Sequence, residues 1–146
     1  MIQRIQSIFL FLAGGASFSL FGLPFASTNE AVAQSSIFSD SLYNLNDQVA
    51  LMVLFGLGGL LAVISIFMYK NRQLQMRLAI FSFIANLIGI VLAVVFFMQN
   101  SSAMGNVAVN DELGIYPPIL ALILTLVARY FINKDEKLVR SMDRLR

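Results

Sequence analysis

Few side chains in this chain are of the types that carry out acid–base, nucleophilic or metal chemistry. Cysteine and histidine are both absent from its 146 residues. Their absence removes thiolate ligands, disulfides and the side chain best suited to proton transfer near neutral pH. Among the carboxylates, Asp111 and Glu112 are adjacent in a polar loop, while Glu30 and Asp40 have no visible partner. Adjacent loop carboxylates are usually solvated. We therefore predict no catalytic residue, no cofactor, no metal site and no enzymatic activity.

Four long apolar stretches dominate the rest of the sequence. Hydrophobic residues make up 58% of the chain and charged residues 12%, against about 25% charged residues in a soluble domain. The stretches are residues 5–25, 49–69, 78–98 and 115–132. A helix of about 20 apolar residues crosses a hydrocarbon core of about 30 Å. The sequence therefore predicts a single all-α domain, residues 1–146, built as an integral membrane bundle of four transmembrane helices.

The basic residues all lie toward one end of these stretches. They are Arg4, Lys70, Arg72, Arg77, Arg129, Lys134, Lys137, Arg140, Arg144 and Arg146. The two connections on the other side, residues 26–48 and 99–114, contain none. Short cytoplasmic loops carry the excess of Lys and Arg, so we predict a multi-pass membrane protein with both termini cytoplasmic. Its basic face would lie against an anionic inner leaflet.

The first apolar stretch has a rival interpretation as a secretory signal peptide. Arg4 gives a charged start, and Ala31, Val32 and Ala33 resemble a small-residue cleavage site. However, the apolar part of a signal peptide is about 7–15 residues long, which is shorter than this stretch. We favour a retained helix.

The polar tail, residues 133–146, has a helical pattern of its own. Leu138, Val139, Met142 and Leu145 recur at helical spacing. The pattern predicts a short cytoplasmic amphipathic helix, which either continues the fourth span or lies on the membrane surface. Docking to a partner protein is a second interpretation of the same pattern.

Polar and small residues inside the spans indicate packing rather than a pathway. Arg129 is the one ionisable residue within a span and lies close to its end. Asn86 and Ser82, one turn apart, either face a substrate pathway or form an interhelical hydrogen bond, and we prefer the hydrogen bond. A stripe of small residues at four-residue spacing follows the same helix, formed by Ala85, Gly89 and Ala93. Small residues let membrane helices approach closely, so these five positions are the predicted packing residues.

Three segments together resemble a known family. They are the start MIQRIQSIFL, the hairpin turn YKNRQLQMRL and the end NKDEKLVRSMDRLR. In this order around four apolar stretches, they resemble a family of small inner-membrane proteins of Bacteroidota catalogued only as a domain of unknown function. The resemblance covers essentially the whole chain. It implies a multi-pass protein of a bacterial inner membrane, with four membrane helices and both termini cytoplasmic, and it assigns no catalytic or binding residue.

Three functional hypotheses follow from these observations. The first is a non-enzymatic accessory or structural subunit of a membrane complex, which contacts a membrane-protein partner or a second copy of itself. The contact residues would be Arg72, Arg77, Lys137, Arg140 and Arg144, together with the small-residue helix faces. The second is a small transporter or lipid-handling protein. The third is a membrane enzyme that uses the loop carboxylates. We do not expect nucleic-acid binding.

Overall fold

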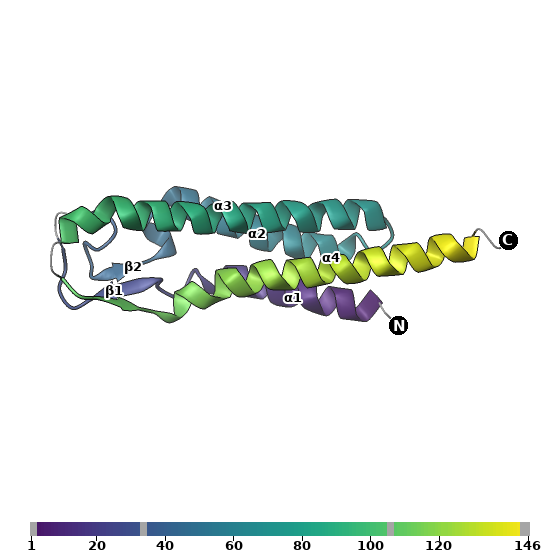
Figure 1. Cartoon of the computed structure of the whole chain (residues 1–146), viewed down its shortest axis with the longest axis horizontal. Coiled ribbons are helices and arrows are strands. Elements are labelled where there is room, and N and C mark those ends of the chain that lie inside the picture. Colours follow the sequence, from purple (N-terminus) through teal and green to yellow (C-terminus); the bar gives the residue numbers. More distant parts are fainter. Residues whose placement is uncertain (1–2, 33–34, 105–106, 144–146) are drawn as a thin grey trace.

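The computed structural model describes residues 3–32, 35–104 and 107–143 and contains a bundle of four antiparallel helices. The helices are α1 (Gln3–Ser19), α2 (Val49–Phe67), α3 (Arg72–Met104) and α4 (Tyr116–Asp143). Helix α1 packs against α2 and α4, and α3 packs against the same two helices. The start of α1 and the end of α4 therefore lie at the same end of the bundle, as Figure 1 shows. The all-α, four-helix prediction is confirmed.

Three of the helices are long and apolar enough to cross a membrane. They are α2, α3 and α4. Helix α1 is shorter, with 17 residues, or about 26 Å at 1.5 Å per residue. It ends at Ser19, whereas hydropathy predicted a span to residue 25. The chain turns through Phe21 and Gly22, and the Phe25 N–H then donates to Tyr43 O at 2.8 Å. Residues after Ser19 leave the helix because their backbone joins a sheet.

Helices α3 and α4 are longer than the predicted spans. Helix α3 begins at Arg72, six residues before the apolar stretch, and continues to Met104. Its first turns contain Arg, Gln, Leu and Met, which are all good helix formers. Helix α4 continues without a break from Tyr116 to Asp143. The described part of the polar tail therefore extends the fourth helix. Of the two predicted arrangements, a continuation of the fourth span and a separate helix on the membrane surface, the structure has the first. Hydropathy locates the part of a helix that lipid can surround, but it does not locate the helix ends.

A small antiparallel sheet joins the two connections that lack basic residues. Strands β1 (Ala26–Thr28), β2 (Leu42–Tyr43) and β3 (Val109–Asp111) lie in the order β2-β1-β3. Ala26 pairs with Tyr43 on one side and with Asp111 on the other. Two 3-10 turns, Leu45–Asp47 and Leu113–Ile115, lead from the sheet into α2 and α4. We call this end of the molecule the sheet end and the opposite end the basic end.

The sheet end has a buried hydrophobic core. Ile37, Phe38, Tyr43 and Leu45 are buried, and Leu42 is 38% exposed. The buried four pack with Phe25, Phe55 and other residues in one hydrophobic cluster. The two connections are therefore a folded cap on the bundle rather than loose polar loops.

Candidate functional site

Four residues from three helices form a buried hydrogen-bonded cluster in the middle of the bundle, which we call the polar junction: Ser17, Gly58, Ser82 and Asn86. The Ser17 hydroxyl of α1 donates to Asn86 Oδ1 of α3 at 2.8 Å. Asn86 Nδ2 donates to Ser82 O at 2.8 Å, and the Ser82 hydroxyl donates to Gly58 O of α2 at 2.7 Å. All four are buried. The predicted polar pair Ser82 and Asn86 therefore bonds to two neighbouring helices.

Small residues allow close contact at and near the polar junction. A Cβ atom at Gly58 would collide with the Asn86 amide. A Cβ at Gly89 would lie 2.9 Å from the Phe55 ring of α2, and one at Gly59 would lie 3.1 Å from the Phe18 ring of α1. These glycines face inward, so their small size serves packing within the chain.

The two alanines of the predicted stripe are less deeply placed. Ala85 and Ala93 are both half-buried on α3. The Ala93 carbonyl oxygen accepts a hydrogen bond from the Tyr43 hydroxyl at 3.0 Å. Ala93 thus lies where α3 meets the sheet end.

The predicted contact residues at the basic end have different environments. Arg72 Nη2 forms an ion pair with Asp135 Oδ2 at 3.0 Å, and Arg72 Nη1 donates to Asp135 O at 2.9 Å. The Arg72 charge therefore joins α3 to α4 within the chain. Arg77 and Lys137 are exposed. Among the remaining candidates, the Arg140 side chain and all of Arg144 lie outside the described residues.

A second contact at the basic end involves the beginning of α1. Gln6 Nε2 donates to Phe131 O of α4 at 3.3 Å, and the Phe9 and Phe131 rings stack with centroids 5.6 Å apart. Arg129 is exposed on α4, two residues before this contact. It therefore lies level with the first half of α1 rather than inside the polar junction.

Two ionisable side chains at the sheet end have perturbed environments. Burial, and to a smaller extent the charge of Asp47, raises the pKa of the Tyr43 phenol well above its ordinary value. Burial also raises the pKa of the Asp47 carboxyl. A hydrogen bond from the Asn44 N–H to Asp47 Oδ2, at 2.6 Å, lowers this pKa, and the charge of Asp40 raises it. Both side chains help to hold the cap together. Neither lies beside a group that would react with it.

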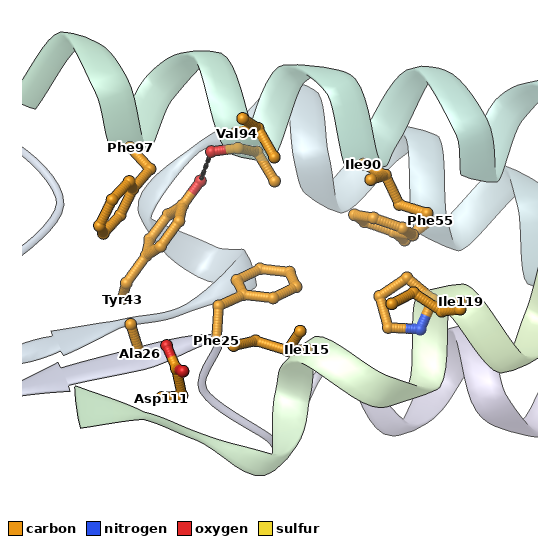
Figure 2. Close-up of a pocket in the computed structure, with 12 residues that line it drawn as sticks. Phe25, Ala26, Tyr43, Phe55, Ile90, Val94, Phe97, Asp111, Ile115 and Ile119 are labelled. Atoms are coloured by element: carbon orange, nitrogen blue, oxygen red, sulfur yellow. Dashed lines mark hydrogen bonds between the residues drawn. The ribbon is translucent and has the colours of Figure 1, made fainter. Parts of the chain in front are cut away.

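An apolar groove of about 320 Å³ lies between α3 and α4 at the sheet end (Figure 2). Figure 1 shows the two helices diverging toward this end. The lining residues come from the cap, α2, α3 and α4: Phe25, Ala26, Tyr43, Phe55, Ile90, Ala93, Val94, Phe97, Asp111, Ile115, Pro118 and Ile119. Twelve lining residues include a single charged one, Asp111. Neither Ser82 nor Asn86 belongs to this groove.

The sequence contains no clear signal for the groove. Its floor is formed by Phe25, Phe55 and Tyr43, which come from separate elements and are buried. Asp111 was noted only as one of two adjacent carboxylates.

Comparison with curated proteins gives no match for this chain. A family model matches almost its full length, residues 2–145, and its description is a domain of unknown function, DUF4293. The match agrees with the resemblance carried by the start, the hairpin turn and the end of the sequence. The four-helix bundle, the polar junction and the small cap described above are therefore the structure of a member of this family. The chain belongs to the family of the domain of unknown function DUF4293.

Proposed function

We propose that this chain is a non-enzymatic accessory or structural subunit of a complex in a bacterial inner membrane. The observation that carries the proposal is that the polar side chains of the polar junction are hydrogen-bonded within the chain. Ser17, Ser82 and Asn86 bond to one another or to the backbone of neighbouring helices. A bundle whose interior polar groups hold its helices together is suited to presenting a stable surface.

The proposed topology places the basic end in the cytoplasm. The sheet end contains five carboxylates and no Lys or Arg, whereas the described basic residues lie in α1, α3, α4 and the turn between α2 and α3, away from the sheet end. This distribution matches the rule that short cytoplasmic loops are rich in Lys and Arg. In this topology α1 crosses the membrane with the other three helices, since it packs along α2 and α4. Both termini are then cytoplasmic.

Single cysteines test this topology directly, because the chain has none of its own. Ser39→Cys would place a thiol in an exposed position at the sheet end, and Gln73→Cys would place one in an exposed position at the basic end. In spheroplasts, a membrane-impermeant maleimide should label Ser39→Cys at once and Gln73→Cys only after permeabilisation. The reverse pattern would invert the proposed topology.

The surface proposed to contact the partner is the basic end. The glycines Gly58, Gly59 and Gly89 face other helices of the same chain, so small-residue faces contribute less to external contact. Arg77 and Lys137 are exposed, and Arg140 and Arg144 follow in the sequence. A membrane-protein partner with acidic cytoplasmic loops, or a second copy of the chain, fits this surface.

Affinity purification from native membranes in a mild detergent, with quantitative mass spectrometry, tests the partner. A stoichiometric partner should co-purify with the tagged chain. The Arg140→Ala, Arg144→Ala double variant should lose most of it, while a matched Arg140→Lys, Arg144→Lys variant should keep it. Equal amounts of both variants in the membrane fraction would show that insertion is unaffected. Unchanged co-purification in the alanine variant would remove the tail from the proposed contact.

The alternative function is a small transporter or lipid-handling protein. Transport along Ser82 and Asn86 would need a polar path between the helices, and the hydrogen bonds of these residues argue against one. The apolar groove is the single feature that favours the lipid-handling form of this alternative. Purification of the chain alone or as a homo-oligomer, without a stoichiometric partner, would favour it over the accessory subunit.

A further inference from the structure

We propose that the groove between α3 and α4 holds one acyl chain of a membrane phospholipid whose headgroup carries a primary ammonium, with the ammonium paired to Asp111. The proposal goes beyond the accessory function and depends only on the placement of α3 and α4 across a membrane. Its occupant is set by two features of the groove. One is where the groove opens, and the other is the charge at its rim.

The mouth of the groove is formed by residues that face lipid in a spanning helix. Val94 on α3 is 52% exposed and Ile119 on α4 is 48% exposed, and Figure 2 shows the groove side chains converging between these two helices. Ile90, Val94 and Phe97 occupy the sheet-end half of α3, so the mouth lies at the depth of one leaflet's acyl chains. The groove is therefore open sideways to the membrane.

An acyl chain fits the interior better than water does. The Tyr43 hydroxyl is already used, because it donates to Ala93 O. The other lining groups are almost all apolar, and apolar cavities do not hold water stably. An empty groove would leave its lining atoms without van der Waals partners. Its volume of about 320 Å³ is at the lower limit of ligand pockets, about 300–1,000 Å³, which suits one chain rather than a whole lipid.

The charge at the rim selects the headgroup. Asp111 is exposed at the end of β3, a few residues before α4 begins, and thus at the level of lipid headgroups. Within the described part of the chain, no cation or donor pairs with its carboxylate. The whole sheet end has five carboxylates and no Lys or Arg, so an anionic headgroup would be repelled. A primary ammonium donates N–H groups to a carboxylate as lysine does, whereas a quaternary ammonium has no N–H group.

A tryptophan reporter tests occupancy, because the chain contains no tryptophan. Ile119→Trp would place the indole in the groove mouth. Ile123→Trp is the matched control: Ile123 lies one turn further along α4, is 53% exposed and does not line the groove. Each variant would be reconstituted in phosphatidylcholine vesicles that contain a small fraction of phosphatidylethanolamine with brominated acyl chains, which quench tryptophan.

We expect brominated phosphatidylethanolamine to quench the Ile119→Trp variant about two- to fivefold more strongly than the Ile123→Trp variant, the range set by one partly exposed ion pair. Brominated phosphatidylglycerol and brominated phosphatidylcholine should quench the two variants equally. Adding Asp111→Asn to Ile119→Trp should remove the preference for phosphatidylethanolamine. Equal quenching of the two positions by phosphatidylethanolamine would overturn the site. A preference for phosphatidylglycerol, or one that survives Asp111→Asn, would overturn the headgroup assignment.

A second measurement uses the unmodified chain. Native mass spectrometry from mild detergent, after incubation with equal amounts of the three lipids, should show a single bound phosphatidylethanolamine, and Asp111→Asn should lose it. Random retention of all three lipids would overturn the proposal. Neither experiment depends on a protein partner, so a failed co-purification and a failed lipid preference remain distinguishable.

Discussion

The Ser17 hydroxyl on α1 donates a hydrogen bond to Asn86 Oδ1 on α3 at 2.8 Å, and both side chains are almost completely buried. This bond crosses the bundle between two helices that are not otherwise strongly packed against each other. In lipid, the hydrophobic effect does not drive helices together, so an interhelical hydrogen bond of this kind contributes to their association. The polar junction therefore specifies which faces of α1, α2 and α3 meet.

Replacing Ser17 with alanine should destabilise the bundle by removing the donor to Asn86 Oδ1. We expect a loss of about 0.6–2 kcal/mol, the range for interhelical hydrogen bonds in membrane proteins. The measurement is unfolding in mixed micelles with increasing SDS, followed by circular dichroism. Ser19→Ala is the matched control, because the Ser19 hydroxyl bonds only to Ala16 O of its own helix. Equal losses in the two variants would contradict the role of the junction.

Replacing Gly58 with alanine should be more damaging than the same change at Gly15. The added methyl group at Gly58 would displace the Asn86 amide, whereas one at Gly15 would meet no atom within 4 Å. We expect Gly58→Ala to cost about 1–3 kcal/mol, as overpacked sites do, and Gly15→Ala to be neutral or slightly stabilising. The same SDS titration measures both, and a tolerant Gly58 would show that α2 can move away from α3 without loss.

The pairing of Arg72 with Asp135 should contribute stability that depends on salt. Arg72→Ala and Asp135→Asn should each destabilise the contact of α3 with α4, and the double variant should lose less than the sum of the two. Because both side chains are partly exposed, 23% and 14%, salt should weaken the coupling. Arg77→Ala, at an exposed position of the same helix, is the control. A coupling energy near zero at low salt would mean that the pair contributes nothing measurable.

Stability should fall as the pH rises through the pKa of Asp47. Burial raises this pKa in the folded chain, so the folded state binds more protons than the unfolded state just above the ordinary aspartate value of about 3.9. The stabilisation is complete below the unfolded pKa and is lost as the pH passes the folded pKa. Asp47→Asn keeps a side-chain oxygen for the Asn44 N–H and should flatten the dependence of Tm on pH.

Asp40→Asn provides the graded control for this dependence. The charge of Asp40 raises the pKa of Asp47, so its removal should shift the fall in stability to lower pH without abolishing it. Thermal unfolding at closely spaced pH values in detergent measures both variants. An unchanged profile in Asp47→Asn would assign the pH dependence to other groups.

The sequence was sufficient for the helices but not for the cap. Four apolar stretches predict four helices because each must satisfy its backbone hydrogen bonds internally if lipid surrounds it. The sheet was missed because its strands have only two or three residues, too few to show an alternating pattern. Its central pairing also joins residues far apart in sequence, such as Ala26 and Asp111.

The candidate site was likewise predicted from the sequence only in part. The i,i+4 spacing of Ser82 and Asn86 indicated that both could face the same neighbouring helix, whereas Ser82 bonds to α2 and Asn86 accepts a hydrogen bond from α1. Nothing in the sequence indicated that Ser17 supplies the donor, because the choice of partner depends on how the helices are rotated. Arg72 and Asp135 likewise gave no local signal, since they lie 63 positions apart.

The two ends of the bundle are held together by different kinds of contact. At the sheet end, β1 is paired on both sides, and Pro24 O accepts the Gly114 N–H at 2.9 Å, so both connections are fastened to each other. At the basic end, side-chain contacts such as those of Arg72 and Gln6 hold the helices. A binding partner at the basic end would therefore meet helices joined through side chains, whereas the groove is bordered by connections that backbone hydrogen bonds fasten to each other.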